Sequence, residues 1–159
     1  MTPKKSKRIL VVDACVLRSA GETVHPVSST CRVCLEKIRT ICHKVIVTND
    51  LKEEWNKHKS RFSSLWLVSM AARKKYLVNN ELPDVDIDFS TFSKKSESAV
   101  RKDIHLVEAA YAADKIIVTL DTSFESALKE TSEGESIHGS LTWINPVTLG
   151  HNAIDSIED

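Results

Sequence analysis

The chain has 159 residues with equal numbers of basic and acidic side chains, 22 of each, and 42% of its residues are hydrophobic. This composition is typical of one globular domain and excludes a wholly disordered chain. The apolar runs are far shorter than the roughly 20 residues that span a bilayer, and Asp13 interrupts the first of them. We therefore expect a cytoplasmic protein without a membrane partner, with a single domain over residues 1–150 and a flexible tail over residues 151–159.

The first half of the chain alternates apolar runs with helical patterns. Arg8–Val12 and Lys44–Val47 are short runs rich in β-branched residues, which is typical of strands buried on both faces. Apolar residues recur at helical spacing in three segments: Ser29–His43, Asp50–Lys59 and Arg61–Leu77. The stretch from Asn79 to Ser93, which contains Pro83, is expected to be a surface loop.

The second half repeats this alternation. A helix is expected over Ser98–Asp114, followed directly by the strongest strand pattern, Lys115–Leu120. The next segments are a helix from Thr122 to Glu130 that opens with capping-box spacing at Thr122 and Glu125, a polar loop over Ser132–Gly139 and a last strand, Leu141–Ile144. Strands separated by helices predict an α/β fold, here a three-layer sandwich with a short, mainly parallel central sheet.

Three of the four cysteines lie in the first long helical segment. Cys31 and Cys34 have the spacing of half a zinc site or of a redox pair. They also lie, with Leu35 and Ile38, on the apolar stripe of the helix. Because a free cysteine packs as a small hydrophobic residue, we interpret this pair as part of the core.

Charge is distributed unevenly along the chain. Residues 1–75 hold 16 Lys and Arg against 6 Asp and Glu, and residues 76–159 hold the reverse. This asymmetry indicates either a basic surface beside an acidic one or two halves that attract each other in the fold.

Acidic residues recur where strands are expected to end. Asp13 and Asp121 directly follow two strand patterns, Glu53 and Glu54 lie in the helix after a third, and Asp103 lies on the core-facing stripe of its helix. Each has a structural alternative, as a helix cap or as a partner of the helix dipole. Carboxylates that converge repel one another. An oxygen-only set of this kind favours a hard cation, Mg²⁺ or Mn²⁺.

Four segments in this order resemble the PIN domain. They are Val11–Leu17, Val45–Trp55, Lys102–Ala110 and Ile117–Asp121, and the resemblance extends from about residue 8 to residue 146. Asp121 follows Asp103 at a separation of 18 residues, which is similar to the family's spacing. The sequence departs from the family at Cys15, where many relatives have a polar residue two positions after the first aspartate.

The resemblance implies a metal-dependent endoribonuclease that cleaves single-stranded RNA and leaves a 3′-hydroxyl and a 5′-phosphate. Its acidic residues correspond to Asp13, Asp103, Asp121 and Glu54, with Glu53 as the alternative glutamate. A bound Mg²⁺ or Mn²⁺ would activate the attacking water. Residues 1–150 would then form one PIN-like nuclease domain. The alternatives are a PIN-like binding or scaffold module without activity, and a DNA nuclease with the same metal chemistry.

Substrate binding is expected beside these acids. Thr119 matches a hydroxyl position of the family that orients a carboxylate or the substrate. The basic residues expected to hold phosphates are Lys57, Lys59, Arg61, Arg101 and Lys102. The alternative is that this basic run is only a solvated surface. The resemblance also implies a toxin, defence or RNA-processing role, with an antitoxin or other regulatory protein and a second copy of the chain as partners.

Overall fold

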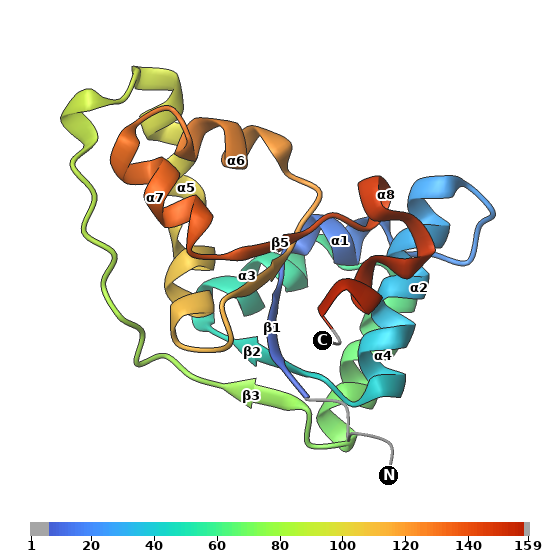
Figure 1. Ribbon diagram of the computed structural model, residues 1–159. Coiled ribbons are helices and arrows are strands. Elements are labelled where there is room, and N and C mark those ends of the chain that lie inside the picture. Colours follow the sequence, from blue (N-terminus) through green and yellow to red (C-terminus); the bar gives the residue numbers. More distant parts are fainter. Residues whose placement is uncertain (1–6, 158–159) are drawn as a thin grey trace, which may run out of the picture.

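The computed structural model describes residues 7–157 and has a five-stranded sheet at its centre (Figure 1). The strands are β1 (Ile9–Val12), β2 (Lys44–Val47), β3 (Tyr76–Val78), β4 (Ile116–Val118) and β5 (Thr142–Ile144). All neighbouring pairs are parallel, in the order β3-β2-β1-β4-β5. The chain builds the sheet outward on one side of β1 and then continues on the other side with β4, so the strand order reverses between β1 and β4.

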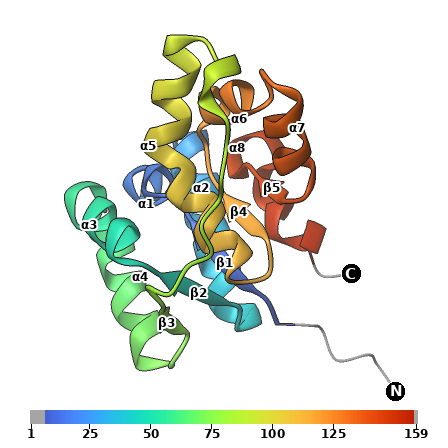
Figure 2. The same cartoon turned by 90° about the vertical axis from the view of Figure 1, so that its left-hand side faces the viewer.

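Helices flank the sheet on both faces. They are α1 (Ala14–Ser19), α2 (Pro26–Ile41), α3 (Asn49–His58), α4 (Arg61–Ala72), α5 (Lys94–Tyr111), α6 (Thr122–Leu128), α7 (Ser132–Gly139) and α8 (Pro146–Leu149), with 3₁₀ helices η1 (Phe89–Thr91) and η2 (Gly150–Ile157). Figures 1 and 2 show α2 and α4 on one side of the sheet and α5 on the other. The three-layer α/β architecture expected from the sequence is confirmed.

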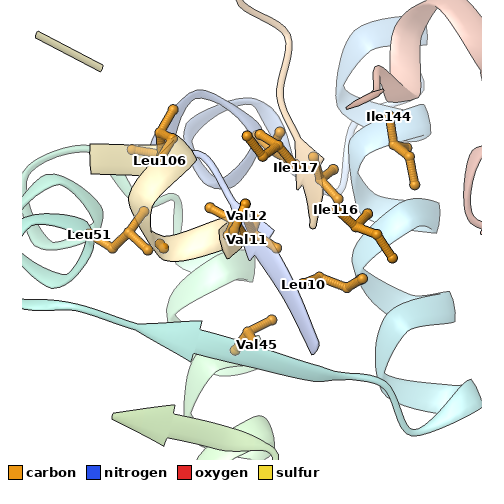
Figure 3. Packing of buried hydrophobic residues seen from close by; sticks show 14 of the residues in the cluster. Leu10, Val11, Val12, Val45, Leu51, Leu106, Ile116, Ile117 and Ile144 are labelled. Atoms are coloured by element: carbon orange, nitrogen blue, oxygen red, sulfur yellow. The ribbon is translucent and has the colours of Figure 1, made fainter. Parts of the chain in front are cut away.

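The core is centred on β1 (Figure 3). Leu10, Val11 and Val12 are completely buried, and successive side chains of a strand point to opposite faces. Each face therefore buries apolar side chains against a helical layer, to which α5 contributes Leu106. This explains why the strand is a continuous apolar run instead of an alternating one.

Two elements differ from the sequence-based prediction in the first half. The helix that begins at Arg61 ends at Ala72 instead of Leu77, and Lys74 takes a left-handed conformation (φ 60°). The chain then turns into β3, which pairs with β2 at one edge of the sheet. A strand of three residues gives too short a pattern to separate from the end of a helix.

The segment over Ser132–Gly139 is a helix, so the prediction of a polar loop was wrong. The hydroxyl of Thr131 caps it by accepting from the backbone N–H of Gly134 at 3.0 Å. Two glycines and a largely exposed polar surface conceal the helical pattern in this segment.

The end of the chain also differs from the expected flexible tail. Residues 150–157 form η2, in which Ala153 and Ile154 are buried and which packs against α2. Lys37 of α2 forms an ion pair with Asp155 at 3.2 Å. Buried apolar contacts therefore order this segment, while residues 158 and 159 lie outside the described part.

The cysteine pair lies in the core as expected. Cys31 and Cys34 are at most 2% exposed and both are free thiols. The helix starts three residues earlier than predicted, because His25 caps it and Pro26 occupies its first turn. No helix within residues 7–157 is long and apolar enough to cross a membrane.

Candidate functional site

The reversal of strand order brings two aspartates together. Asp13 follows β1 and its backbone N–H donates to the carbonyl of Val118 at the end of β4, at 2.9 Å. Asp121 lies three residues beyond that carbonyl. Both side chains line one cavity of about 340 Å³ at the carboxyl ends of the strands, where open α/β sheets bind their ligands.

Two helices bring the other acids to this cavity. Asp103 lies on α5 and Glu54 on α3, and both line the cavity. The position of α3 is fixed by Trp55, whose buried indole N–H donates to the carbonyl of Val12 at 2.8 Å. Glu53 instead forms an ion pair with Lys57 at 3.2 Å and lines a neighbouring cavity. The structure therefore brings Glu54, and not Glu53, together with the three aspartates.

A hydrogen-bond network fixes the carboxylate of Asp13. The hydroxyl of Thr119 donates to Asp13 Oδ2 at 2.7 Å and accepts from the backbone N–H of Asp121 at 3.0 Å. Cys15 Sγ lies 3.4 Å from the same Oδ2 and accepts from the backbone N–H of Leu120 at 3.3 Å. Thr119 thus orients a carboxylate, which is one of its two expected roles.

The thiol of Cys15 is part of this network through its contact with Asp13. Burial, and then the charge of Asp13, raises the pKa of Cys15 to about 12. The sulfur therefore keeps its proton near neutral pH and serves as a weak hydrogen-bond donor.

The electrostatics of the cavity appear most clearly at Asp103. Burial, followed by the negative charges of Asp13 and Asp121, raises the pKa of this carboxyl to about 7, while Lys102 acts in the opposite direction. Half-burial of an acid among other acids is costly, because each charge opposes ionisation of the next. Such a set is unusual as a purely structural feature and is typical of functional sites.

Asp121 also has a structural role. Its Oδ1 accepts from the backbone N–H of Phe124 at 3.0 Å and so caps α6. The predicted capping box is therefore wrong: the cap is Asp121 instead of Thr122, and Glu125 lies 2.9 Å from His138 Nε2. Since capping occupies one carboxylate oxygen, it is compatible with a second role for this side chain.

The donor chemistry of the cavity fits a hard divalent cation. Carboxylate oxygens are the ligands that Mg²⁺ and Mn²⁺ prefer. Burial raises the pKa of Asp103 most, and the negative charges of Asp13 and Asp121, which a cation would neutralise, raise it further. The four acids line the cavity without converging on one point: within residues 7–157, no three His, Cys, Asp or Glu side chains are grouped closely enough to hold an ion. Binding therefore requires side-chain adjustment around Asp13, the carboxylate that the network holds in place.

Only one of the predicted phosphate-binding residues lines this cavity. Lys102 lies there beside Asp103. Lys57 is paired with Glu53, and Lys59 donates to Asn56 at 3.1 Å.

Two further predicted basic residues do not line this cavity either. Arg101 pairs with Glu97 at 3.0 Å and stacks on the ring of Phe89. Arg61 begins α4 with an exposed side chain and does not line the cavity.

Two basic residues that the sequence analysis missed complete the cavity. Arg18 of α1 and His58 of α3 line it together with the acids. His58 has a sequence signal, because it follows Glu54 by one helical turn. Arg18 follows Asp13 by five residues, a separation that does not make two helical residues neighbours. His58 Nε2 lies 3.9 Å from Glu54 Oε2.

No model of a known protein family matches this chain, and no curated protein is significantly similar to it.

Proposed function

We propose that this protein is a metal-dependent endoribonuclease of the PIN type that cleaves single-stranded RNA. One observation carries the proposal: acids from four separate elements, Asp13, Glu54, Asp103 and Asp121, line a single cavity where the order of a parallel sheet reverses. The order of these acids in the chain supports the PIN resemblance. Mg²⁺ or Mn²⁺ would be held by Asp13, Asp103 and Asp121, with Glu54 close by.

The residues of the cavity have complementary roles in hydrolysis of a phosphodiester. A bound cation would supply a hydroxide near neutral pH and neutralise charge developing at phosphorus. Thr119 and Cys15 hold Asp13 in one orientation. Arg18 and Lys102 attract the phosphate into a cavity whose acids repel it. Attack of water on phosphorus breaks the P–O3′ bond, and the leaving oxygen takes a proton to become the 3′-hydroxyl.

The alternatives make different demands on the site. A binding or scaffold module of the same fold has no need for acids that repel one another, yet all four line the cavity. A DNA nuclease would use the same acids and would cut single-stranded DNA in the assay below. The proposed setting is cytoplasmic, with a toxin, defence or RNA-processing role. An antitoxin or other regulatory protein and a second copy of the chain are the proposed partners.

The test is a cleavage assay with end-labelled single-stranded RNA and single-stranded DNA, in Mn²⁺ or in EDTA. We expect RNA to be cut internally in Mn²⁺ only. Glu54→Gln is expected to lower the rate strongly, because Glu54 lines the acid cavity. Glu53→Gln removes the same charge from the neighbouring residue, which pairs with Lys57 outside that cavity, and is expected to leave the rate nearly unchanged. Cleavage that persists in EDTA, or equal loss in both variants, would contradict the proposal.

A further inference from the structure

A second groove lies between α5 and α6. It has a volume of about 350 Å³ and is lined mostly by hydroxyl side chains, with one lysine. The lining residues are Lys95, Ser96, Ala99, Thr122, Ser123, Ser126 and Ala127. Most of these side chains are exposed or half-buried, so the groove is open to a polymer that lies across it.

Neighbouring residues line this groove and the acid cavity on both walls. On one wall, Asp121 lines the cavity and the next residue, Thr122, lines the groove. On the other wall, Lys95, Ala99 and Lys102 recur at i, i+4 and i+7 on α5 and so share one face of the helix. The two lysines are separated by about 10 Å along the helix axis. Lys102 lies beside the acids and Lys95 at the far end of the groove.

Charge distinguishes this groove from the two other cavities around the site. None of its lining residues is acidic. The cavity between α3 and α5 contains four carboxylates beside Arg101 and Lys102. The cavity beyond α6 contains Asp88, Glu130 and Glu133 and no basic residue. A polyanion that leaves the acid cavity therefore meets the least repulsion between α5 and α6.

We propose that the groove between α5 and α6 binds the sugar–phosphate backbone next to the scissile bond, with Lys95 in contact with a phosphate. This inference rests on the proposed function and names where its substrate lies. Hydroxyl groups both donate and accept hydrogen bonds, so those of Ser123 and Ser126 suit ribose hydroxyls and phosphate oxygens alike.

The first test measures binding without cleavage. Affinity of fluorescent single-stranded RNA is determined in EDTA at several salt concentrations, with every variant made in an Asp13→Asn background. Lys95→Gln is expected to lower the log–log salt slope by about 0.7, which is about a 5-fold loss of affinity at 0.1 M salt. Lys94→Gln is the matched control, because this neighbour carries the same charge, is exposed and lines none of these cavities.

The second test fills the groove. Ser126→Tyr is expected to weaken RNA binding several-fold, whereas Ser98→Tyr, an exposed position on α5 outside the groove, leaves it unchanged. Thermal melting of both variants establishes that they are folded. Equal effects of Lys95→Gln and Lys94→Gln would overturn the assignment, as would tight binding by Ser126→Tyr.

The two proposals can fail separately. Binding that depends on Lys95, in a protein that never cleaves RNA, supports the groove and contradicts the nuclease. Metal-dependent cleavage with no difference between Lys95→Gln and Lys94→Gln contradicts the groove and leaves the nuclease in place.

Discussion

Helices α2 and α5 both carry chemically reactive side chains on the face turned toward the sheet, with opposite consequences. On α2, Cys31 and Cys34 are enclosed by apolar side chains, and burial raises their thiol pKa to about 11 and 12. On α5, Asp103 is half-buried opposite the acids of β1 and β4. A neutral thiol packs as a hydrophobic group, whereas a carboxylate in such a place needs compensation. The motif with the stronger resemblance to a metal site is therefore structural, and an isolated aspartate lies at the proposed site.

The largest expected difference between the two helices is in catalysis. Asp103→Asn is expected to lower the rate of RNA cleavage roughly 100-fold or more, because it removes transition-state stabilisation of about 3 kcal/mol. Cys34→Ala is expected to leave the rate unchanged below its melting temperature. Single-turnover cleavage of labelled RNA in Mn²⁺ measures both, and a comparable loss in the cysteine variant would show that the thiols take part.

Metal binding is expected to give the next largest effect. Mn²⁺ at 100 times its Kd stabilises the folded state by about 2.7 kcal/mol, which raises the Tm by roughly 5–10 °C for a chain of this size. Asp121→Asn is expected to lose most of this shift and to stay folded, because asparagine also caps a helix. Thermal melts across millimolar Mn²⁺ measure it. A Tm independent of Mn²⁺ in the unmodified protein would argue against a metal site.

The cysteines are expected to affect stability instead. Cys31→Ala and Cys34→Ala are each expected to lower the free energy of unfolding by about 1–2 kcal/mol, as small truncations in a packed core. Chemical denaturation measures this loss. Stoichiometric zinc in the purified protein, absent from both variants, would replace the packing interpretation with a metal site.

The smallest effect is a pH dependence at Asp103. Its folded-state pKa of about 7 lies above that of an unfolded aspartate, about 3.9. The stabilisation from its bound proton is therefore complete below pH 4 and is lost as the pH rises through 7. In EDTA, the free energy of unfolding of Asp103→Asn, relative to that of the unmodified protein, is expected to rise by about 1 kcal/mol from pH 4 to pH 8. This figure is reduced for the partial exposure of the side chain. Denaturation at both pH values measures it, and a constant difference would contradict the raised pKa.

Most of the fold could be predicted from the sequence, because the patterns that mark its strands and helices lie within short stretches of the chain. The runs at β1, β2 and β4 are continuous and apolar, and the stripe of α2 is regular enough to identify Cys31 and Cys34 as core residues. By contrast, β3 is an edge strand of three residues, and α7 depends on a cap at Thr131 more than on an apolar face. Both were missed because the pattern in each is too short or too weak.

Part of the site could be predicted, because parallel strands place their carboxyl ends at the same edge of a sheet. This rule places Asp13 and Asp121 in one cavity without knowledge of the structure. The phosphate-binding residues were harder to predict, because nearness to the acids in the sequence does not bring a basic side chain into the cavity. Lys57, Lys59 and Arg101 instead contact side chains of their own helices and do not line it. His58 could have been found from its spacing of one helical turn after Glu54, whereas the place of Arg18 in the cavity is visible only in the structure.

The pairing of β1 with β4 has a consequence for the cell that makes this protein. Asp13 and Asp121 are separated by 108 residues, so a ribosome that adds 5–20 residues per second needs about 5–20 s between them. Until β4 emerges and pairs with β1, the aspartates have no common cavity. A nuclease of the proposed kind would therefore spare the messenger RNA from which it is translated until most of the chain has been made.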